Sequence, residues 1–67
     1  MATHIQTALT ILRRPDVEAA TGLSRSTIYQ RIKEKTFPAA VRLGPHSVGW
    51  RLGDIHRFLE NPAGFKA

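Results

Sequence analysis

The apolar positions of this chain change in spacing from helical to strand-like and back to helical. Val17 and Ala20, and then Ile28 and Ile32, lie three or four residues apart, which is typical of one face of a helix. Further on, apolar and polar residues alternate on both sides of the turn-rich stretch 44–47, which indicates a β-hairpin. The pattern predicts the order helix, turn, helix, hairpin, helix.

Capping residues set the bounds of the first two predicted helices. The first is expected from near Arg14 to Gly22, with a proline at its first helical position and a glycine in the left-handed conformation that ends many helices. The second is expected over 25–34, after the N-cap hydroxyl of Ser24. Only Gly22 and Leu23 separate the first helix from that cap, and two helices joined by so tight a turn are typical of a helix-turn-helix.

The hairpin is expected to pair 41–43 with 48–50, with Leu43 and Trp50 packed onto the helices. Ile11 and Leu12 can form a short strand. A last helix is expected over 53–60, where apolar residues again repeat at helical spacing before an Asn-Pro pair. The sequence therefore predicts a mainly α winged helix-turn-helix over residues 11–61, with a flexible N-terminal arm (1–10) and a flexible tail (62–67).

Composition excludes several classes of function. The chain has 67 residues and no cysteine, so we expect one small domain without disulfides or thiolate metal ligands. Its three histidines lack the spacing of metal ligands, and no nucleophile–base pair or phosphate-cradling glycine loop is present. We expect no metal, no cofactor, no small-molecule substrate and no enzymatic activity. No apolar run approaches the roughly 20 residues that span a bilayer, and 1–10 does not resemble a signal peptide, so we expect a cytoplasmic protein without membrane contact.

The positive charge is concentrated in the centre of the chain. The net charge is +5, and the segment from Ser24 to Arg51 carries six cationic residues against a single acid, Glu34. Elsewhere cations and acids cancel. A basic segment of this kind indicates a polyanionic partner, of which double-stranded DNA is the first candidate. A solvated basic surface is the alternative that charge alone leaves open.

The second predicted helix supplies the candidates for reading DNA bases. With Ile28 and Ile32 turned inward, the opposite face is polar and hydrogen-bonding, as a helix in the major groove requires. The expected base-reading residues are Arg25, Ser26, Thr27 and Gln30, and the expected phosphate contacts are Tyr29 and Lys33. Each is also compatible with an ordinary solvated helix surface, and Tyr29 with a half-buried core aromatic.

The hairpin adds three further candidates. Arg42 points outward by alternation and suits a phosphate contact. His46 lies in the expected tip, where a wing can reach DNA, although a simple turn residue fits the same position. Arg51 can reach a phosphate or pair with Asp54, and the sequence does not separate the two. Trp50 is expected in the core, because so small a domain needs a large buried side chain.

These residues also form motifs that resemble a known family. The segments that carry the resemblance are Leu12-Arg13-Arg14, Asp16-Val17, Thr21-Gly22-Leu23-Ser24-Arg25-Ser26-Thr27-Ile28-Tyr29, Ile32-Lys33, Phe37-Pro38, Val41-Arg42-Leu43-Gly44 and Val48-Gly49-Trp50-Arg51. They resemble the AlpA family of prophage regulators, akin to excisionases and to MerR-type winged helix-turn-helix domains, over roughly residues 11–60. One departure lies at Lys35 and Thr36, where many relatives have a glycine.

The resemblance implies DNA binding at promoter or attachment-site repeats, with the recognition helix at 24–33 and the wing at 41–51. We therefore expect a sequence-specific DNA-binding regulator of phage type. The alternatives are an excisionase-like directionality factor that bends attachment-site DNA, and an inhibitor that docks the same fold on a protein partner. No heptad or additional helix predicts a stable dimer, so we expect a monomer in solution, with cooperative binding on tandem DNA sites left open.

Overall fold

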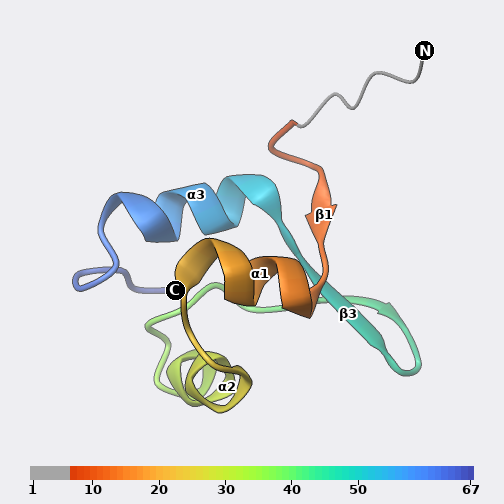
Figure 1. Cartoon of the computed structure of the whole chain (residues 1–67), viewed down its shortest axis with the longest axis horizontal. Helices are drawn as coiled ribbons and strands as arrows, with labels where there is room; N and C mark the ends of the chain where they lie inside the picture. The colour runs from red at the N-terminus through yellow and green to blue at the C-terminus, as the bar shows by residue number, and fades with distance from the viewer. Residues whose placement is uncertain (1–6) are drawn as a thin grey trace.

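The elements follow one another in the predicted order, with a short strand before the first helix. A computed structural model describes residues 7–67 (Figure 1). Its elements are β1 (Ile11–Leu12), α1 (Arg14–Thr21), α2 (Arg25–Lys33), β2 (Val41–Gly44), β3 (Ser47–Arg51) and α3 (Leu52–Glu60). The three strands form an antiparallel sheet in the order β1-β3-β2, and the hairpin of β2 and β3 extends away from the helices as a wing (Figure 1). The predicted winged helix-turn-helix is confirmed.

The tight turn between α1 and α2 forms as its capping residues predict. Gly22 has a φ of 73°, and its N–H donates to the Glu18 carbonyl at 2.8 Å. A glycine is needed there because a Cβ is unfavourable in the left-handed region. Ser24 then caps α2, since its hydroxyl accepts the Thr27 N–H at 3.3 Å.

Trp50 lies at the centre of the core, as predicted. Its side chain is fully buried, and the indole N–H donates to the Pro38 carbonyl at 3.0 Å. The ring of Phe37 meets it edge-on at a centroid distance of 6.5 Å, and the Phe58 ring lies 4.6 Å beyond Phe37. These aromatic residues share one cluster with the buried side chains of Val17, Ile28 and Ile55. The cluster therefore joins all three helices to β3.

The hairpin departs from simple alternation at Leu43. Arg42 pairs with Val48 and Gly44 pairs with Ser47, so Leu43 has no partner on β3 and forms a bulge. A bulge changes the face to which the residue points, and the Leu43 side chain is 43% exposed. The prediction that Leu43 packs onto the helices is wrong for this reason.

β1 crosses close to the end of β3, and a glycine makes the approach possible. Leu12 pairs with Trp50, and a Cβ added at Gly49 would lie 2.9 Å from the Leu12 carbonyl oxygen. Before the strand, the carbonyls of Ala8 and Thr10 accept the N–H groups of the first two residues of α3. This end of the predicted N-terminal arm therefore bonds to the domain, and residues 1–6 of the arm lie outside the described residues.

Residues 62–67, expected as a flexible tail, pack against the domain instead. The half-buried Phe65 ring meets Phe58 edge-on at 5.7 Å, and the Ala67 N–H donates to the Lys35 carbonyl at 2.8 Å. The guanidinium of Arg31 donates to the carbonyls of Pro62 at 2.8 Å and Thr36 at 3.2 Å. The same group lies 5.1 Å from the centre of the Phe58 ring. An aromatic residue and a helix cation thus anchor a segment that has no periodic pattern of its own.

Lys35, just after α2, has a φ of 63° and is strained, because the left-handed region costs a residue with a Cβ roughly 1–2 kcal/mol. The substitution Lys35→Gly should therefore raise the free energy of unfolding by about 0.5–1 kcal/mol, after allowance for the added freedom of the unfolded chain. Urea unfolding followed by Trp50 fluorescence measures the change. Thr36→Gly is the control, since Thr36 has no positive φ and should lose stability. A loss for Lys35→Gly as large as the control's would contradict the prediction.

Arg31→Met should lower the free energy of unfolding by about 1–3 kcal/mol, because the two hydrogen bonds to Thr36 and Pro62 disappear. Methionine keeps the apolar stem, so the loss isolates the guanidinium. The matched control is Lys33→Met, which removes an exposed cation from the same helix and should change stability by less than about 0.5 kcal/mol. Equal losses for the two variants would rule out the anchoring role of Arg31.

Candidate nucleic-acid interface

The outward face of α2 is the one that the sequence predicts. Ile28 is fully buried and Ile32 half-buried against the core. The polar residues assigned to the opposite side are all exposed, namely Ser26, Thr27, Gln30 and Lys33, and so is Arg25 in the first turn of the helix. A helix that is anchored on one side and polar on the other presents its donors and acceptors to whatever lies against it.

Hydroxyl groups meet one another at the first turn of α2. The Ser24 hydroxyl lies 3.0 Å from that of Thr27 and 3.3 Å from that of Ser26. Each hydroxyl has one donor and two acceptor sites, so the group retains capacity for an external partner. The N-cap role of Ser24 and the exposure of Ser26 and Thr27 are therefore compatible.

An acidic residue lies on this face next to Gln30, and the sequence analysis missed it. The Gln30 side-chain N–H donates to the Glu34 carboxylate at 2.9 Å. Glu34 is one turn further along, at the C-cap of α2, and directly follows the predicted recognition helix (24–33). The i,i+4 spacing of a glutamine and an acid is the signal that could have revealed it. The bond leaves the Gln30 amide oxygen and one N–H for an external partner.

Tyr29 is partly exposed, at 38%, and its ring lies 6.4 Å from the Trp50 ring in a tilted arrangement. The Arg25 guanidinium lies 5.9 Å from the centre of the Tyr29 ring. The ring of Tyr29 therefore lies against the core, and its exposed part remains compatible with the predicted phosphate contact.

The three candidates from the hairpin do not lie together. Arg42 is exposed on β2, and His46 is exposed in the turn between the strands. Arg51 lies at the opposite end of β3, beside β1, where its guanidinium is 4.0 Å from the Asp54 carboxylate. That distance is the upper limit of an ion pair, and both groups are partly exposed, so the pair adds little stability.

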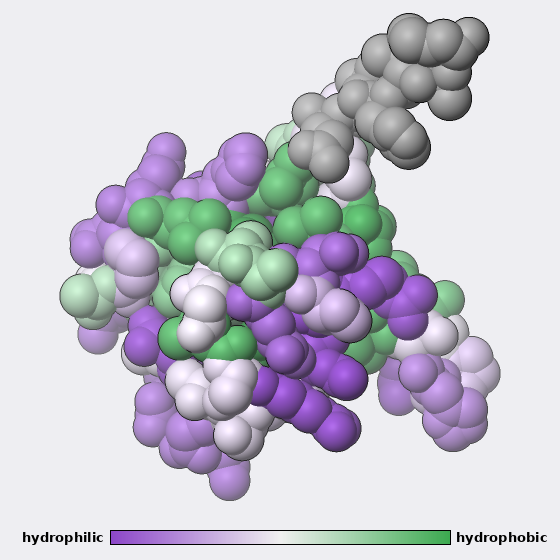
Figure 2. All heavy atoms as spheres, in the orientation of Figure 1, coloured by the Kyte–Doolittle hydropathy of each residue, from purple (hydrophilic) through white to green (hydrophobic). Residues whose placement is uncertain are grey.

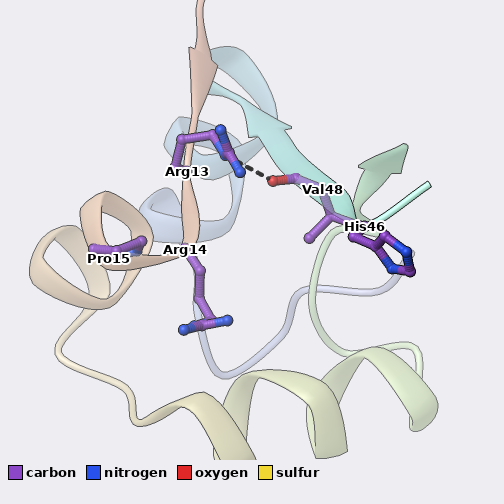
Figure 3. A pocket seen from close by; sticks show the side chains of 5 residues that line it. All are labelled: Arg13, Arg14, Pro15, His46 and Val48. Carbon is purple, nitrogen blue, oxygen red and sulfur yellow. Dashed lines mark hydrogen bonds between the residues drawn. The ribbon is translucent and has the colours of Figure 1, made fainter. Parts of the chain in front are cut away.

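His46 borders a pocket that the sequence analysis did not foresee. The pocket has a volume of about 160 Å³ and is lined by Arg13, Arg14, Pro15, His46 and Val48 (Figure 3). The Arg13 Nε donates to the Val48 carbonyl at 3.1 Å, and the Arg14 Nε lies 3.2 Å from the Glu18 carboxylate. The two arginines escaped notice because Asp16 and Glu18 cancel them in a count of charge. Their position as a pair at the start of the first helix was the available signal.

The described residues also limit other kinds of chemistry. Within 7–67, no helix is long and apolar enough to cross a membrane. No three His, Asp or Glu side chains of this part of the chain gather as metal ligands would.

Arg31, one of the six cations of the basic segment, is turned toward Pro62 and Phe58 and does not join the outward face of α2.

Comparison with known proteins identifies relatives of the chain. Residues 10–62 match the family described as Prophage CP4-57 regulatory protein (AlpA). The chain is 51% identical over 48 residues to the uncharacterized protein ORF88 of Enterobacteria phage P4, with 72% of this chain and 54% of the P4 protein covered. It is 40% identical over 60 residues to the DNA-binding transcriptional activator AlpA of Escherichia coli K12, with 81% of this chain and 86% of that protein covered. No solved structure matches the chain.

Proposed function

The chain belongs to the AlpA family of prophage regulatory proteins, and from that premise we propose that it is a phage-type regulator that binds double-stranded DNA. The relative in Escherichia coli is named as a DNA-binding transcriptional activator. Regulation of transcription by sequence-specific binding is therefore the proposed role of this chain.

One observation carries the proposal: the exposed polar face of α2 lies directly opposite its buried isoleucines. The major groove of B-DNA is about 12 Å wide and admits an α-helix. In such a groove the N-terminal half of the helix meets the bases. Ser26, Thr27 and Gln30 lie on the exposed face of α2, and Arg25 begins the helix.

Each side chain has a chemical role in the proposed complex. The amide of Gln30 can bind adenine N6 and N7, and the Arg25 guanidinium can bind guanine O6 and N7. Ser26 and Thr27 serve bases or phosphates. The cations of Lys33 and Arg42, together with the Tyr29 hydroxyl, contact phosphates, and His46 approaches the backbone or minor groove at the tip of the hairpin. Arg51 has no part in this contact surface, because it lies at the far end of β3 beside Asp54.

We propose that the protein acts in the cytoplasm and binds as a monomer, with cooperativity restricted to tandem sites. The excisionase-like alternative differs in the shape of the bound DNA. A directionality factor would bend its site, which changes the mobility of complexes on circularly permuted fragments. The name of the Escherichia coli relative favours regulation over bending.

Purified protein should enrich one sequence from a pool of randomised duplexes. The enriched duplex should bind at least tenfold more tightly than a scrambled one, because its bases match the side chains of α2. With about four to six phosphates neutralised, the logarithm of the binding constant should fall against the logarithm of salt concentration with a slope of roughly −4 to −5. Gel-shift titrations at several salt concentrations measure both quantities.

Equal affinity for the enriched and scrambled duplexes would contradict sequence-specific regulation. Absence of binding to any duplex would contradict DNA binding altogether and favour the alternative in which the basic face docks on an acidic protein.

Gln30→Ala should relax the preference at one base pair of the enriched site by about 1–3 kcal/mol, because an amide that reads a base edge is removed. Lys33→Ala is the matched comparison from the same exposed face. It should weaken binding to all duplexes alike and lower the salt slope by about one unit, as expected for a phosphate contact. Affinities for single-base variants of the enriched site separate the two patterns. An unchanged preference in Gln30→Ala would remove this residue from base reading.

A further inference from the structure

The pocket beside His46 joins two segments that are far apart in the chain. Residues 13–15 lead into α1, and residues 46–48 form the turn of the hairpin and the start of β3. Figure 3 shows Arg13 reaching toward Val48 and Arg14 extending from the start of α1 toward α2, with His46 on the opposite side of the pocket and its imidazole turned away from the arginines. Figure 2 shows mostly hydrophilic residues over this region, whereas hydrophobic residues gather closer to β1 and α3.

Hydrogen bonds hold the arginine side chains at the pocket while leaving donors unused. The Arg13 Nε is bonded to the Val48 carbonyl at 3.1 Å, which fixes the guanidinium between α1 and β3. A guanidinium has five N–H donors, so its outer nitrogens still offer paired donors to an oxyanion. The Arg13 backbone N–H is already bonded to the Asp16 carboxylate at 3.3 Å, and the Glu18 carboxylate pairs with Arg14. The negative charge of Glu18 therefore opposes an anion in the pocket, although its carboxylate occupies only the Nε of Arg14.

The position of the pocket indicates which anion enters. In the proposed complex α2 lies in the major groove and the hairpin tip approaches the neighbouring minor groove. The two grooves of a duplex are separated by one sugar–phosphate strand. That strand must cross the surface between α2 and the hairpin, which is where Figure 3 shows Arg14 and His46.

We propose that this pocket binds a phosphate of the DNA backbone, with Arg13 and Arg14 as its donors and His46 at its rim. The proposal rests on the proposed function and extends it, because it assigns a contact to α1 that is separate from the reading face of α2. The pocket, with a volume of about 160 Å³, has room for a phosphate group. Because Glu18 bonds only the Nε of Arg14, the outer nitrogens of this guanidinium can donate to the phosphate oxygens while the ion pair is kept.

Arg14→Gln should weaken binding of a scrambled 20-base-pair duplex about fivefold at about 0.15 M salt and reduce the salt slope by about one unit, because one phosphate contact is lost. Affinity for the enriched duplex should fall by the same factor, so the ratio of the two affinities should stay constant. Glu18→Gln should do the reverse and tighten both complexes, since a negative charge that repels the phosphate is removed. His46→Ala tests the same pocket from the hairpin, away from the ion pair.

The matched control is Arg57→Gln, which removes the same charge from the last turn of α3, an element that does not line the pocket. Urea unfolding of each variant shows whether the domain still folds. The proposal is overturned if Arg14→Gln and His46→Ala each weaken duplex binding no more than Arg57→Gln does. Such a result would leave the proposed function of α2 intact. A wild-type protein that binds no duplex would overturn both.

Inorganic phosphate separates a backbone contact from a site for small anions. In spectra of the labelled protein, the scrambled duplex should shift the signals of Arg13, Arg14 and His46. Shifts of these signals by millimolar inorganic phosphate alone, with none on addition of the duplex, would contradict the proposal.

Discussion

The buried Trp50 side chain is the interaction on which the arrangement of this domain depends. It belongs to β3, and its indole N–H is bonded to the carbonyl of Pro38, in the loop that connects α2 to the hairpin. Tyr29 of α2 and Phe37 of the loop both lie against its ring. A domain of this size buries little apolar surface, so the contacts of one large residue make up a large share of its core. The contacts of Trp50 therefore hold the wing in place relative to the recognition helix. The same contacts that stabilise the fold therefore set the spacing between the two surfaces that would meet DNA.

The net charge of the central segment hides how its charged groups are used. Arg31 is counted with the basic residues, yet its guanidinium bonds to Pro62 and covers Phe58. Conversely, Arg13 and Arg14 cancel against neighbouring acids in the sequence, yet they line a pocket beside the hairpin turn. Charge counts give the sign of a partner, because long-range attraction depends on the sum. They do not give the contacts, which depend on where tertiary packing leaves each guanidinium.

Local signals predicted most of the fold, and the features that they missed depend on distant contacts. Gly22 and Ser24 marked the turn correctly because capping is decided within a few residues. The alternation around the hairpin placed Trp50 correctly but misplaced Leu43, because a bulge leaves no mark on an apolar–polar pattern. Packing of Phe65 on Phe58 was not predictable, because the tail has no periodic pattern, whereas the departure from glycine at Lys35 and Thr36 did mark the turn in which Lys35 is left-handed. On α2 the periodicity gave the exposed face and the i,i+4 spacing of Gln30 and Glu34 was available for their contact, whereas the pocket between the arginines and the hairpin required coordinates.

The bond between Gln30 and Glu34 bears on how a short helix can be selective. Specificity is a difference between affinities, and a group that repels the wrong arrangement contributes to it as much as a group that attracts the right one. Glu34 at the C-cap of α2 disfavours any approach in which its carboxylate faces a phosphate. The N-terminal half of α2 begins at the Ser24 cap and carries no acid, so no carboxylate repels a phosphate there. An acid that holds Gln30 by its amide therefore also orients the helix, and in the proposed complex both effects direct the same residues toward the bases.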